Sequence, residues 1–333
     1  MNRKRVLVLG DLPGDGLARL QAGCSVTVRK QGVGSEDELA SLVPGYHGLL
    51  TLLTQRVGDA VFAAGTDLRI VANCAVGVDN IDLAAAARHD VVVTNTPDVL
   101  TDDTADLTWA LILALMRGVV SGDRLTRRGE FNGWQPMMLL GRSLRGSVLG
   151  VIGAGRIGQA VLTRAPAFGV ATLYHQRRPL PPQVEAALNT EWRSLPDLLA
   201  QSQVISLHAS LNDSSFHLLD EPRLRSMQEG SFLVNTARGP LIDELALAKV
   251  LQEGYLAGAG LDVYEREPRI VPELMAMENV VLLPHIGSAT WETRVRMADC
   301  CFDDLVTLLV HNKVPDRSVV DPTEESPFSE VRK

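Results

Sequence analysis

Hydrophobic positions along the chain gather in short runs separated by longer mixed segments. Runs rich in Val, Ile and Leu occupy residues 5–9, 48–53, 68–73 and 91–94, and then residues 148–152, 171–174, 203–208, 231–235, 257–263 and 279–283. The segments between them have the spacing of amphipathic helices. Continuous apolar runs are typical of parallel strands that are buried on both faces. The pattern therefore predicts an α/β chain with two series of parallel strands.

Two segments interrupt this alternation. Residues 101–117 are apolar almost all round, and Thr101, Asp102 and Asp103 can cap a helix start. We therefore expect a buried helix between the two series of strands. Residues 127–145 contain Gly, Trp and Pro and follow neither periodicity, which predicts an extended arm.

Composition narrows the classes of function. The chain of 333 residues has room for two domains, and its net charge of -8 disfavours nucleic acid and anionic membranes as partners. The apolar runs near the N-terminus and at residues 107–116 are too short for a signal peptide or a membrane span, so we expect a cytoplasmic protein with no membrane partner. The four cysteines lack metal-ligand spacing, so we expect reduced thiols and no metal site.

A glycine-rich motif follows the run at residues 148–152 and opens a helical segment. It reads Gly153-Ala154-Gly155-Arg156-Ile157-Gly158. Its first glycine permits a tight turn, the second lets the backbone approach a pyrophosphate, and the third lets the helix pack on the strand. The helix N-terminus then offers N–H donors to the phosphates. In this context the motif predicts a dinucleotide-binding site.

The end of the next strand bears on the choice of cofactor. An NAD site usually has Asp or Glu there, about twenty residues after the glycine motif. This chain has His175, Gln176, Arg177 and Arg178 instead. Guanidinium groups form forked, charge-assisted hydrogen bonds with phosphate. We therefore expect a preference for NADP(H), with NAD(H) as the alternative cofactor; a surface loop decorated with two arginines is the other interpretation.

Three later segments carry reactive side chains just after predicted strands. Arg238 follows residues 231–235, Glu267 follows 257–263 and His285 follows 279–283. Ligands of open parallel sheets bind at the carboxyl ends of strands, so these side chains are expected to converge. A histidine exchanges protons near neutral pH, and a nearby carboxylate orients its ring. An arginine pairs with a substrate carboxylate and stabilises charge on a carbonyl oxygen.

Together, these motifs resemble those of a known family. With residues 75–80, 94–101, 236–239 and 284–290 they are similar to the D-isomer-specific 2-hydroxyacid dehydrogenases over nearly the whole chain, and within these to glyoxylate/hydroxypyruvate reductases. The resemblance implies two Rossmann-like, doubly wound parallel-sheet domains with an active-site cleft between them. It implies a substrate domain at residues 1–99 and 286–320, a cofactor domain at 100–285 and a flexible tail at 321–333.

The resemblance also implies roles for single residues. His285 is expected to be the acid/base, Glu267 its partner and Arg238 the ligand of the substrate carboxylate. Further substrate contacts are implied for the N–H groups of Val76 and Gly77 and for Ser288. Further cofactor contacts are implied for Thr104, Thr236, Ala237, Asp262 and Gly287.

The implied reaction is reduction of a small 2-oxoacid, glyoxylate or hydroxypyruvate, to the D-2-hydroxyacid. A homodimer made largely by the cofactor domains is implied as well, and the arm would carry Trp134 toward the partner subunit's active site. The sequence does not fix which 2-oxoacid is used or the direction of the reaction.

Related activities remain as alternatives. Phosphite dehydrogenases share residues 133–136 but resemble the family with a Lys where this chain has Val76, and formate dehydrogenases have Gln in place of Glu267. Phosphoglycerate dehydrogenase stays open, although we expect no room for a regulatory domain. A cofactor-sensing corepressor or scaffold can keep the same three reactive residues, and turnover of a 2-oxoacid distinguishes it from an enzyme.

Overall fold

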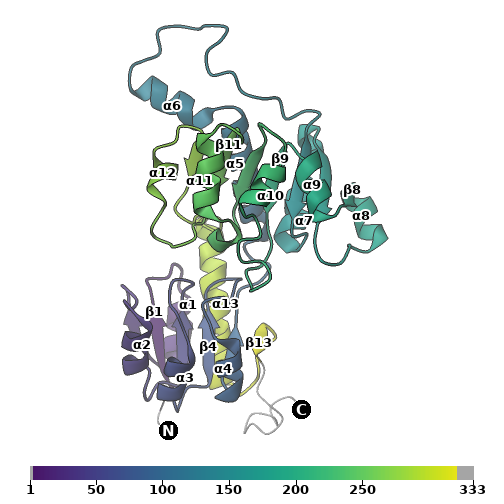
Figure 1. The fold of residues 1–333 in the computed structure, drawn as a ribbon. Helices are drawn as coiled ribbons and strands as arrows, with labels where there is room; N and C mark the ends of the chain where they lie inside the picture. Colours follow the sequence, from purple (N-terminus) through teal and green to yellow (C-terminus); the bar gives the residue numbers. More distant parts are fainter. Residues whose placement is uncertain (1–2, 321–333) are drawn as a thin grey trace. The chain divides into compact units, whose positions relative to one another are not determined.

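The computed structural model describes residues 3–320, which form two compact units (Figure 1). The first unit contains the chain up to Leu100 and again from Ala289, and the second unit runs from Thr101 to Ser288. The boundaries expected from the sequence, at 99/100 and 285/286, lie one and three residues away. The tail expected at residues 321–333 lies outside the described residues.

Residues 286–288 belong to the second unit, where the sequence analysis assigns them to the substrate domain. The amides of Ile286 and Gly287 each donate to the carboxylate of Asp262 at 2.7 Å. The hydroxyl of Thr104 donates to the carbonyl oxygen of Gly287 at 3.1 Å. These hydrogen bonds attach residues 286–288 to the second unit. The boundary between the units therefore lies after Ser288 and not after His285.

The first unit is built on a sheet with the strand order β13-β5-β4-β3-β1-β2. Its strands are β1 (Arg5–Leu9), β2 (Ser25–Arg29), β3 (Gly48–Thr51), β4 (Ile70–Asn73), β5 (Val92–Thr94) and β13 (Ser318–Val320). Its helices are α1 (Gly16–Gly23), α2 (Glu36–Leu42), α3 (Asp59–Ala64), α4 (Leu83–Arg88) and α13 (Trp291–Leu309). All pairings are parallel except that of β13 with β5. All four cysteines lie in this unit and are free thiols.

The second unit is built on a parallel sheet with the order β12-β11-β10-β9-β6-β7-β8. Its strands are β6 (Val148–Ile152), β7 (Ala171–His175), β8 (Thr190–Trp192), β9 (Val204–Leu207), β10 (Phe232–Asn235), β11 (Gly258–Leu261) and β12 (Val280–Leu282). Its helices are α5 (Thr101–Met116), α6 (Val119–Arg127), α7 (Arg156–Arg164), η1 (Ala165–Phe168), α8 (Pro182–Leu188), α9 (Leu195–Gln201), α10 (Glu221–Ser226), η2 (Gly239–Leu241), α11 (Glu244–Gln252) and α12 (Pro272–Met275).

Three strands escape the sequence prediction, and all lie at sheet edges. These are β2, β8 and β13. The strand β2 reads Ser-Val-Thr-Val-Arg, and none of its residues is buried, because only one neighbouring strand covers it. The other two have only three residues each. A search for continuous apolar runs finds strands buried on both faces and passes over short or half-covered edges.

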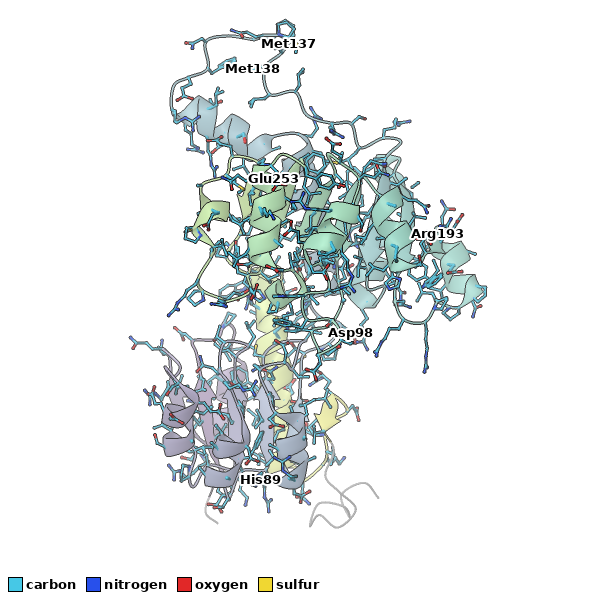
Figure 2. All side chains as sticks on the ribbon, viewed as in Figure 1. His89, Asp98, Met137, Met138, Arg193 and Glu253 are labelled. Atoms are coloured by element: carbon cyan, nitrogen blue, oxygen red, sulfur yellow. The ribbon has the colours of Figure 1, made fainter. Side chains whose placement is uncertain are left out.

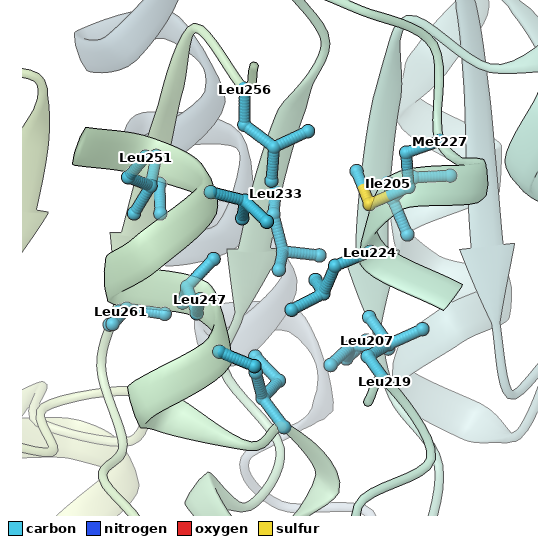
Figure 3. Packing of buried hydrophobic residues seen from close by; sticks show 14 of the residues in the cluster. Ile205, Leu207, Leu219, Leu224, Met227, Leu233, Leu247, Leu251, Leu256 and Leu261 are labelled. Atoms are coloured by element: carbon cyan, nitrogen blue, oxygen red, sulfur yellow. The ribbon is translucent and has the colours of Figure 1, made fainter. Parts of the chain in front are cut away.

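The core of the second unit packs helices onto the central strands. Leu224 of α10 and Leu247 and Leu251 of α11 lie against Leu233 of β10 and Ile205 of β9 (Figure 3). All five are almost fully buried. Each buried side chain of this kind contributes about 1.5–3 kcal/mol of transfer free energy. This packing holds the strand ends, and the loops that follow them, in fixed register.

The helix α5 is buried as expected, and glycines in β11 make room for it. Trp109, Leu111 and Ile112 have less than one-twentieth of their surface exposed. A side chain at Gly260 would begin 3.0 Å from Leu115, so the strand can lie close to the helix only without one. Within residues 3–320 no single helix is long and apolar enough to cross a membrane, although α5 and α6, bent by 64°, would be as a pair.

The arm expected at residues 127–145 is present between α6 and β6. It contains neither helix nor strand from residue 128 to residue 147. Figure 2 shows Met137 and Met138 at its outer end. Trp134 is 79% exposed, Met137 78% and Leu140 67%, so apolar side chains extend from the arm without cover within this chain.

Candidate active site

Register within the second sheet brings the functional loops to one edge. Ile152 at the end of β6 pairs with His175 of β7 and with Leu207 of β9. Leu261 pairs with Asn235 of β10 and with Leu282 of β12. These strands run parallel and end level, so the loops that follow β6, β7, β9, β10, β11 and β12 all leave the same edge of this sheet. The order of the strands reverses at β6, which is where ligands bind in folds of this kind.

The three glycines of the turn after β6 differ in whether the fold itself requires a glycine. Gly153 has φ +96°, which favours glycine, and a Cβ on Gly158 would lie 2.1 Å from the carbonyl oxygen of Gly153. Gly155, the N-cap of α7, has φ -73°, and a Cβ there would meet nothing within 4 Å. The protein's own packing therefore demands glycine at the first and third positions, while the second leaves open space above the helix N-terminus.

A cavity of about 770 Å³ opens at this turn. It is lined by Ile152, Gly153, Gly155, His175, Gln176, Arg177, Arg178, His208, Ala209, Ser210, Asn212, Ser214, Ser215 and Leu218. The glycine turn and residues 175–178 thus share one cavity, as the sequence predicts. The third wall, formed by the loop after β9, is not predicted, because its polar residues form no motif; the only signal is its place after the strand next to β6.

The loop that carries the two arginines is held by neighbouring side chains. The indole of Trp192 donates to the carbonyl oxygen of Gln176 at 3.0 Å, and the hydroxyl of Tyr174 accepts from the amide of Leu180 and donates to Glu185, both at 2.6 Å. Burial raises the pKa of Tyr174 to about 12, so it remains protonated. Nothing in residues 3–320 provides an acidic partner for the exposed guanidiniums of Arg177 and Arg178.

The inner wall of the cavity carries no positive charge from histidine. His208 follows β9, and its Nε2 lies 2.8 Å from the hydroxyl of Ser206. Burial lowers the pKa of His208 to about 3, so the ring is neutral at physiological pH. Cationic groups at this cavity are therefore confined to the exposed Arg177 and Arg178 loop.

His285 and Glu267 form a close pair at the ends of β12 and β11. Nδ1 of His285 lies 2.9 Å from Oε2 and 3.2 Å from Oε1 of Glu267. Burial acts to raise the pKa of Glu267, but the hydrogen bond and charge of His285, the amide of Tyr264 and the charge of Arg238 outweigh it, and the pKa is lowered. An ionised Glu267 holds Nδ1, which leaves Nε2 as the ring nitrogen that can serve a ligand.

Arg238 lies on the turn between β10 and η2. The side chain of Asn235 shapes this turn by accepting from the amide of Ala237 at 3.0 Å and donating to the carbonyl oxygen of Arg238 at 2.8 Å. Gly239 packs directly on the backbone after β11, because a Cβ there would lie 1.8 Å from the carbonyl carbon of Tyr264. The fold thus brings Arg238 near enough to Glu267 to lower its pKa.

Of the other residues expected at the cofactor, Thr104, Thr236, Asp262 and Gly287 are buried within the second unit, and Ala237 is half-buried. Asp262 is 1% exposed and uses both carboxylate oxygens for the amides of Ile286 and Gly287. Thr236 lies 2.9 Å from Thr108 through their hydroxyls. These residues anchor the strand ends. The cavity at the glycine turn is lined by none of the following residues: Thr104, Thr236, Ala237, Asp262, Gly287 and Ser288.

The first unit, taken by itself, holds a loop of free backbone donors after β4. Asn95 donates to the carbonyl oxygen of Val76 at 2.7 Å, and Asn73 donates to that of Gly77 at 2.8 Å. In a planar trans peptide the N–H points opposite to the C=O, so the next amides, of Gly77 and Val78, face away from these asparagines. Within residues 3–320 the amides of Val76, Gly77 and Val78 have no acceptor. Val78 and the two asparagines are not predicted from the sequence.

Comparisons with known proteins show which family the chain resembles. The model of the D-isomer specific 2-hydroxyacid dehydrogenase NAD-binding domain matches residues 109–287. The glyoxylate reductase of Thermococcus kodakarensis is 43% identical over 91% of this chain and 92% of its own, and that of Aeropyrum pernix is 44% identical over 96% of each.

Solved structures with a similar fold are known as well. A protein from Thermus thermophilus superposes with a TM-score of 0.89 at 43% identity, covering 95% of this chain and all of its own. An NADPH-dependent glyoxylate/hydroxypyruvate reductase from Sinorhizobium meliloti, solved with NADP and malonate, has a TM-score of 0.84 at 32% identity and covers 98% of each chain. The cavity at the glycine turn lies within the residues that match the family's NAD-binding domain.

The second and third glycines of the turn give a matched test. Gly155→Ala meets no protein atom and should cost at most about 1 kcal/mol of stability at this N-cap, while its methyl group blocks the approach of a pyrophosphate. Gly158→Ala should destabilise the fold by about 1–3 kcal/mol, because backbone must shift. Urea unfolding without cofactor and fluorescence titration with NADPH and NADH measure both effects. Near-normal cofactor affinity in Gly155→Ala would show that the space above it is not the pyrophosphate site.

Proposed function

The chain belongs to the D-isomer-specific 2-hydroxyacid dehydrogenase family, and on that premise we propose that it reduces glyoxylate or hydroxypyruvate with NADPH to the D-2-hydroxyacid. It is an NAD(P)-dependent oxidoreductase of the family's 2-hydroxyacid dehydrogenase type. The observation that carries the finer proposal is the pairing of His285 with Glu267 at 2.9 Å beside Arg238. A proton donor, its carboxylate partner and a cation for an anionic substrate stand on three adjacent strand ends.

In this proposal each residue has one task. When bound, the dinucleotide would supply the hydride for the carbonyl carbon. His285 gives its Nε2 proton to the carbonyl oxygen, so that one hydride and one proton convert the ketone or aldehyde to an alcohol. Glu267 holds Nδ1 and favours the protonated ring that this step needs. Arg238 pairs with the substrate carboxylate and stabilises negative charge that develops on the oxygen.

The amides of the first unit are proposed as further donors to the substrate carboxylate. Three successive N–H groups without acceptors, at Val76, Gly77 and Val78, form the kind of concave donor set that binds anions. The side chains of Asn73 and Asn95 fix two of the three peptide planes. This geometry supports the assignment of Val76 and Gly77 and adds Val78. Ser288 remains a proposed substrate contact beside His285.

The choice of NADP(H) over NAD(H) rests on the loop after β7. Arg177 and Arg178 are exposed beside the cavity, the loop is held by Trp192 and Tyr174, and the position lacks the carboxylate that would repel a 2′-phosphate. We also propose His175 and Gln176 as neighbours of the ribose. The reductase from Sinorhizobium meliloti, a relative of this chain, was solved with NADP.

Removing both guanidiniums tests the cofactor preference. One charge-assisted hydrogen bond contributes about 1.5–3 kcal/mol, so Arg177→Ala/Arg178→Ala should raise the KM for NADPH roughly 10- to 100-fold. The KM for NADH should change little, and the difference should shrink at high salt, because the contact is exposed. Steady-state kinetics with each cofactor measure both constants. An equal loss for the two cofactors, or a wild type that prefers NADH, would contradict the assignment.

Removing the imidazole tests the acid/base. His285→Ala should lower kcat by roughly 10²–10⁴-fold, while the Kd of NADPH stays near the wild-type value. The exposed His311 offers a control, since His311→Ala should leave both constants unchanged. Rapid-mixing kinetics and calorimetric titration measure the two quantities. A His285→Ala enzyme with near-normal kcat would exclude the proton transfer.

We further propose that two copies of the chain associate through the arm and that Trp134 reaches the partner subunit's active site. The support is the exposure of the apolar side chains Phe131, Trp134, Met137 and Leu140. Apolar groups gathered in this way on a surface segment usually mark an interaction site.

Substitution of Trp134 tests this assignment. Trp134→Ala should change the ratio of kcat/KM for hydroxypyruvate and glyoxylate more than it changes the KM for NADPH. Met137→Ala, at an equally exposed position of the same arm, serves as the control for general disturbance and should leave the ratio unchanged. Sedimentation equilibrium reports whether each variant remains associated. The assignment fails if Trp134→Ala keeps the wild-type ratio or if both variants shift it equally.

A further inference from the structure

A pair of glutamates fixes the segment that carries Glu267. The amide of Glu265 donates to Oε1 of Glu244 at 2.6 Å, and the amide of Glu244 donates to Oε2 of Glu265 at 3.4 Å. Glu244 is the first residue of α11, and Glu265 lies two residues before Glu267. The two residues therefore exchange hydrogen bonds and tie the start of α11 to the loop after β11.

A third residue completes this cluster from the loop after β9. Nε2 of His217 lies 3.3 Å from Oε2 of Glu265, an ion-pair distance, although it lacks the alignment of a hydrogen bond. His217 has φ +47°, an uncommon conformation for a residue with a side chain, and its amide donates to the carbonyl oxygen of Pro240 at 2.8 Å. The neighbouring residues Ser215 and Leu218 line the dinucleotide cavity.

The cluster costs stability, which argues that it does more than hold the fold. Glu244 is 4% exposed, and burial raises its pKa; repulsion from Glu265 and Glu267 adds to the effect, while the hydrogen bond from the amide of Glu265 and the charge of Arg266 oppose it. Burying a carboxyl group beside two others is unfavourable. A neutral side chain could accept the same hydrogen bond at a smaller free-energy cost of burial. Departures of this kind from the stable choice gather at functional sites.

Glu267 gains from the arrangement because its hydrogen bond with His285 depends on alignment. Its Oε1 accepts from the amide of Tyr264 at 3.1 Å, so its carboxylate is bound to the same short segment that Glu244 holds. A hydrogen bond weakens steeply when its angle or distance changes. A displacement at Glu265 would therefore be passed to the contacts of 2.9 and 3.2 Å between Glu267 and His285.

We propose that Glu265, held by Glu244 and His217, positions Glu267 against His285 and so sets the pH range over which the imidazole can donate its proton. The inference rests on the proposed function of His285. Glu265 is a positioning residue, since the contacts described here are with other side chains and backbone. The other charged groups that act on the pair are Asp262, which interacts with His285, and Arg238, which interacts with Glu267.

The test compares pH profiles of kcat/KM for reduction. Reduction needs the protonated ring of His285, so kcat/KM for reduction falls as the pH rises. A weaker carboxylate partner favours the protonated ring less. The fall in kcat/KM then occurs at lower pH. Glu267→Gln serves as the reference and should move it by roughly one pH unit or more. Glu244→Ala should move it by roughly 0.3–1 pH unit in the same direction, while the KM for NADPH stays unchanged. Glu244→Gln keeps the acceptor for the amide of Glu265 and should restore the wild-type profile.

Controls separate positioning from general damage. Glu273→Ala, at an exposed acid of α12, should leave the profile unchanged. Glu244→Ala in the Glu267→Gln background should add no further shift, because the two changes act through one contact. If Glu244→Ala does not fold, His217→Ala, at a side chain that is 30% exposed, takes its place and should shift the profile in the same direction.

The outcomes distinguish a failure of the proposed role of the His285–Glu267 pair from a failure of the positioning role of the cluster. If Glu267→Gln leaves the profile in place, the proposed role of the pair fails. If Glu267→Gln shifts the profile but Glu244→Ala and His217→Ala only lower the melting temperature, the cluster is structural and the positioning role is excluded.

Discussion

In the proposed function, activity depends on the contact of 2.9 Å between Nδ1 of His285 and Oε2 of Glu267. In that proposal the contact leaves Nε2 of His285 for the substrate and keeps a negative charge beside a ring that must carry a proton. The two residues are 18 positions apart and lie at the ends of different strands. Their meeting is a property of the sheet, because parallel strands that end level present their loops at one edge.

Much of the second unit can be understood as support for that contact. Asp262 binds the amides that follow His285, and Tyr264 binds Glu267 through its amide and the carbonyl oxygen of Leu283 through its hydroxyl at 2.7 Å. Buried polar groups that satisfy one another in this way make a single arrangement much more favourable than its neighbours. A site built on strand ends and anchored by buried hydrogen bonds keeps its geometry before the substrate arrives, and this preorganisation is the source of electrostatic catalysis.

Local features of the sequence predict the structure best. The strand β6 has the bounds expected from its apolar run, and the glycine turn follows it as expected, since both depend on neighbouring residues alone. The buried helix α5 and the exposed arm are also found. Edge strands, by contrast, leave a weak apolar signal. The distinction between Gly155 and the other glycines of the turn appears only when the atoms around each are known.

The second layer of the site lies beyond sequence reasoning for a physical reason. Asn73 and Asn95 act on peptides that are neighbours in space, and Glu244 and His217 meet Glu265 only after three loops have folded together. In the sequence, Glu244 cannot be told from an ordinary exposed glutamate in the first turn of a helix. Asp262, expected at the cofactor, uses both carboxylate oxygens for backbone amides, which periodicity and motif cannot reveal.

The product formed from hydroxypyruvate and NADPH by the unmodified protein tests the central claim most directly. Chiral chromatography of the reaction mixture, together with the loss of NADPH absorbance, measures both the rate and the configuration. If the proposed function is right, the protein carries out multiple turnovers and forms D-glycerate, the configuration expected of the D-isomer-specific family. Binding of NADPH without turnover, or formation of L-glycerate, would contradict it.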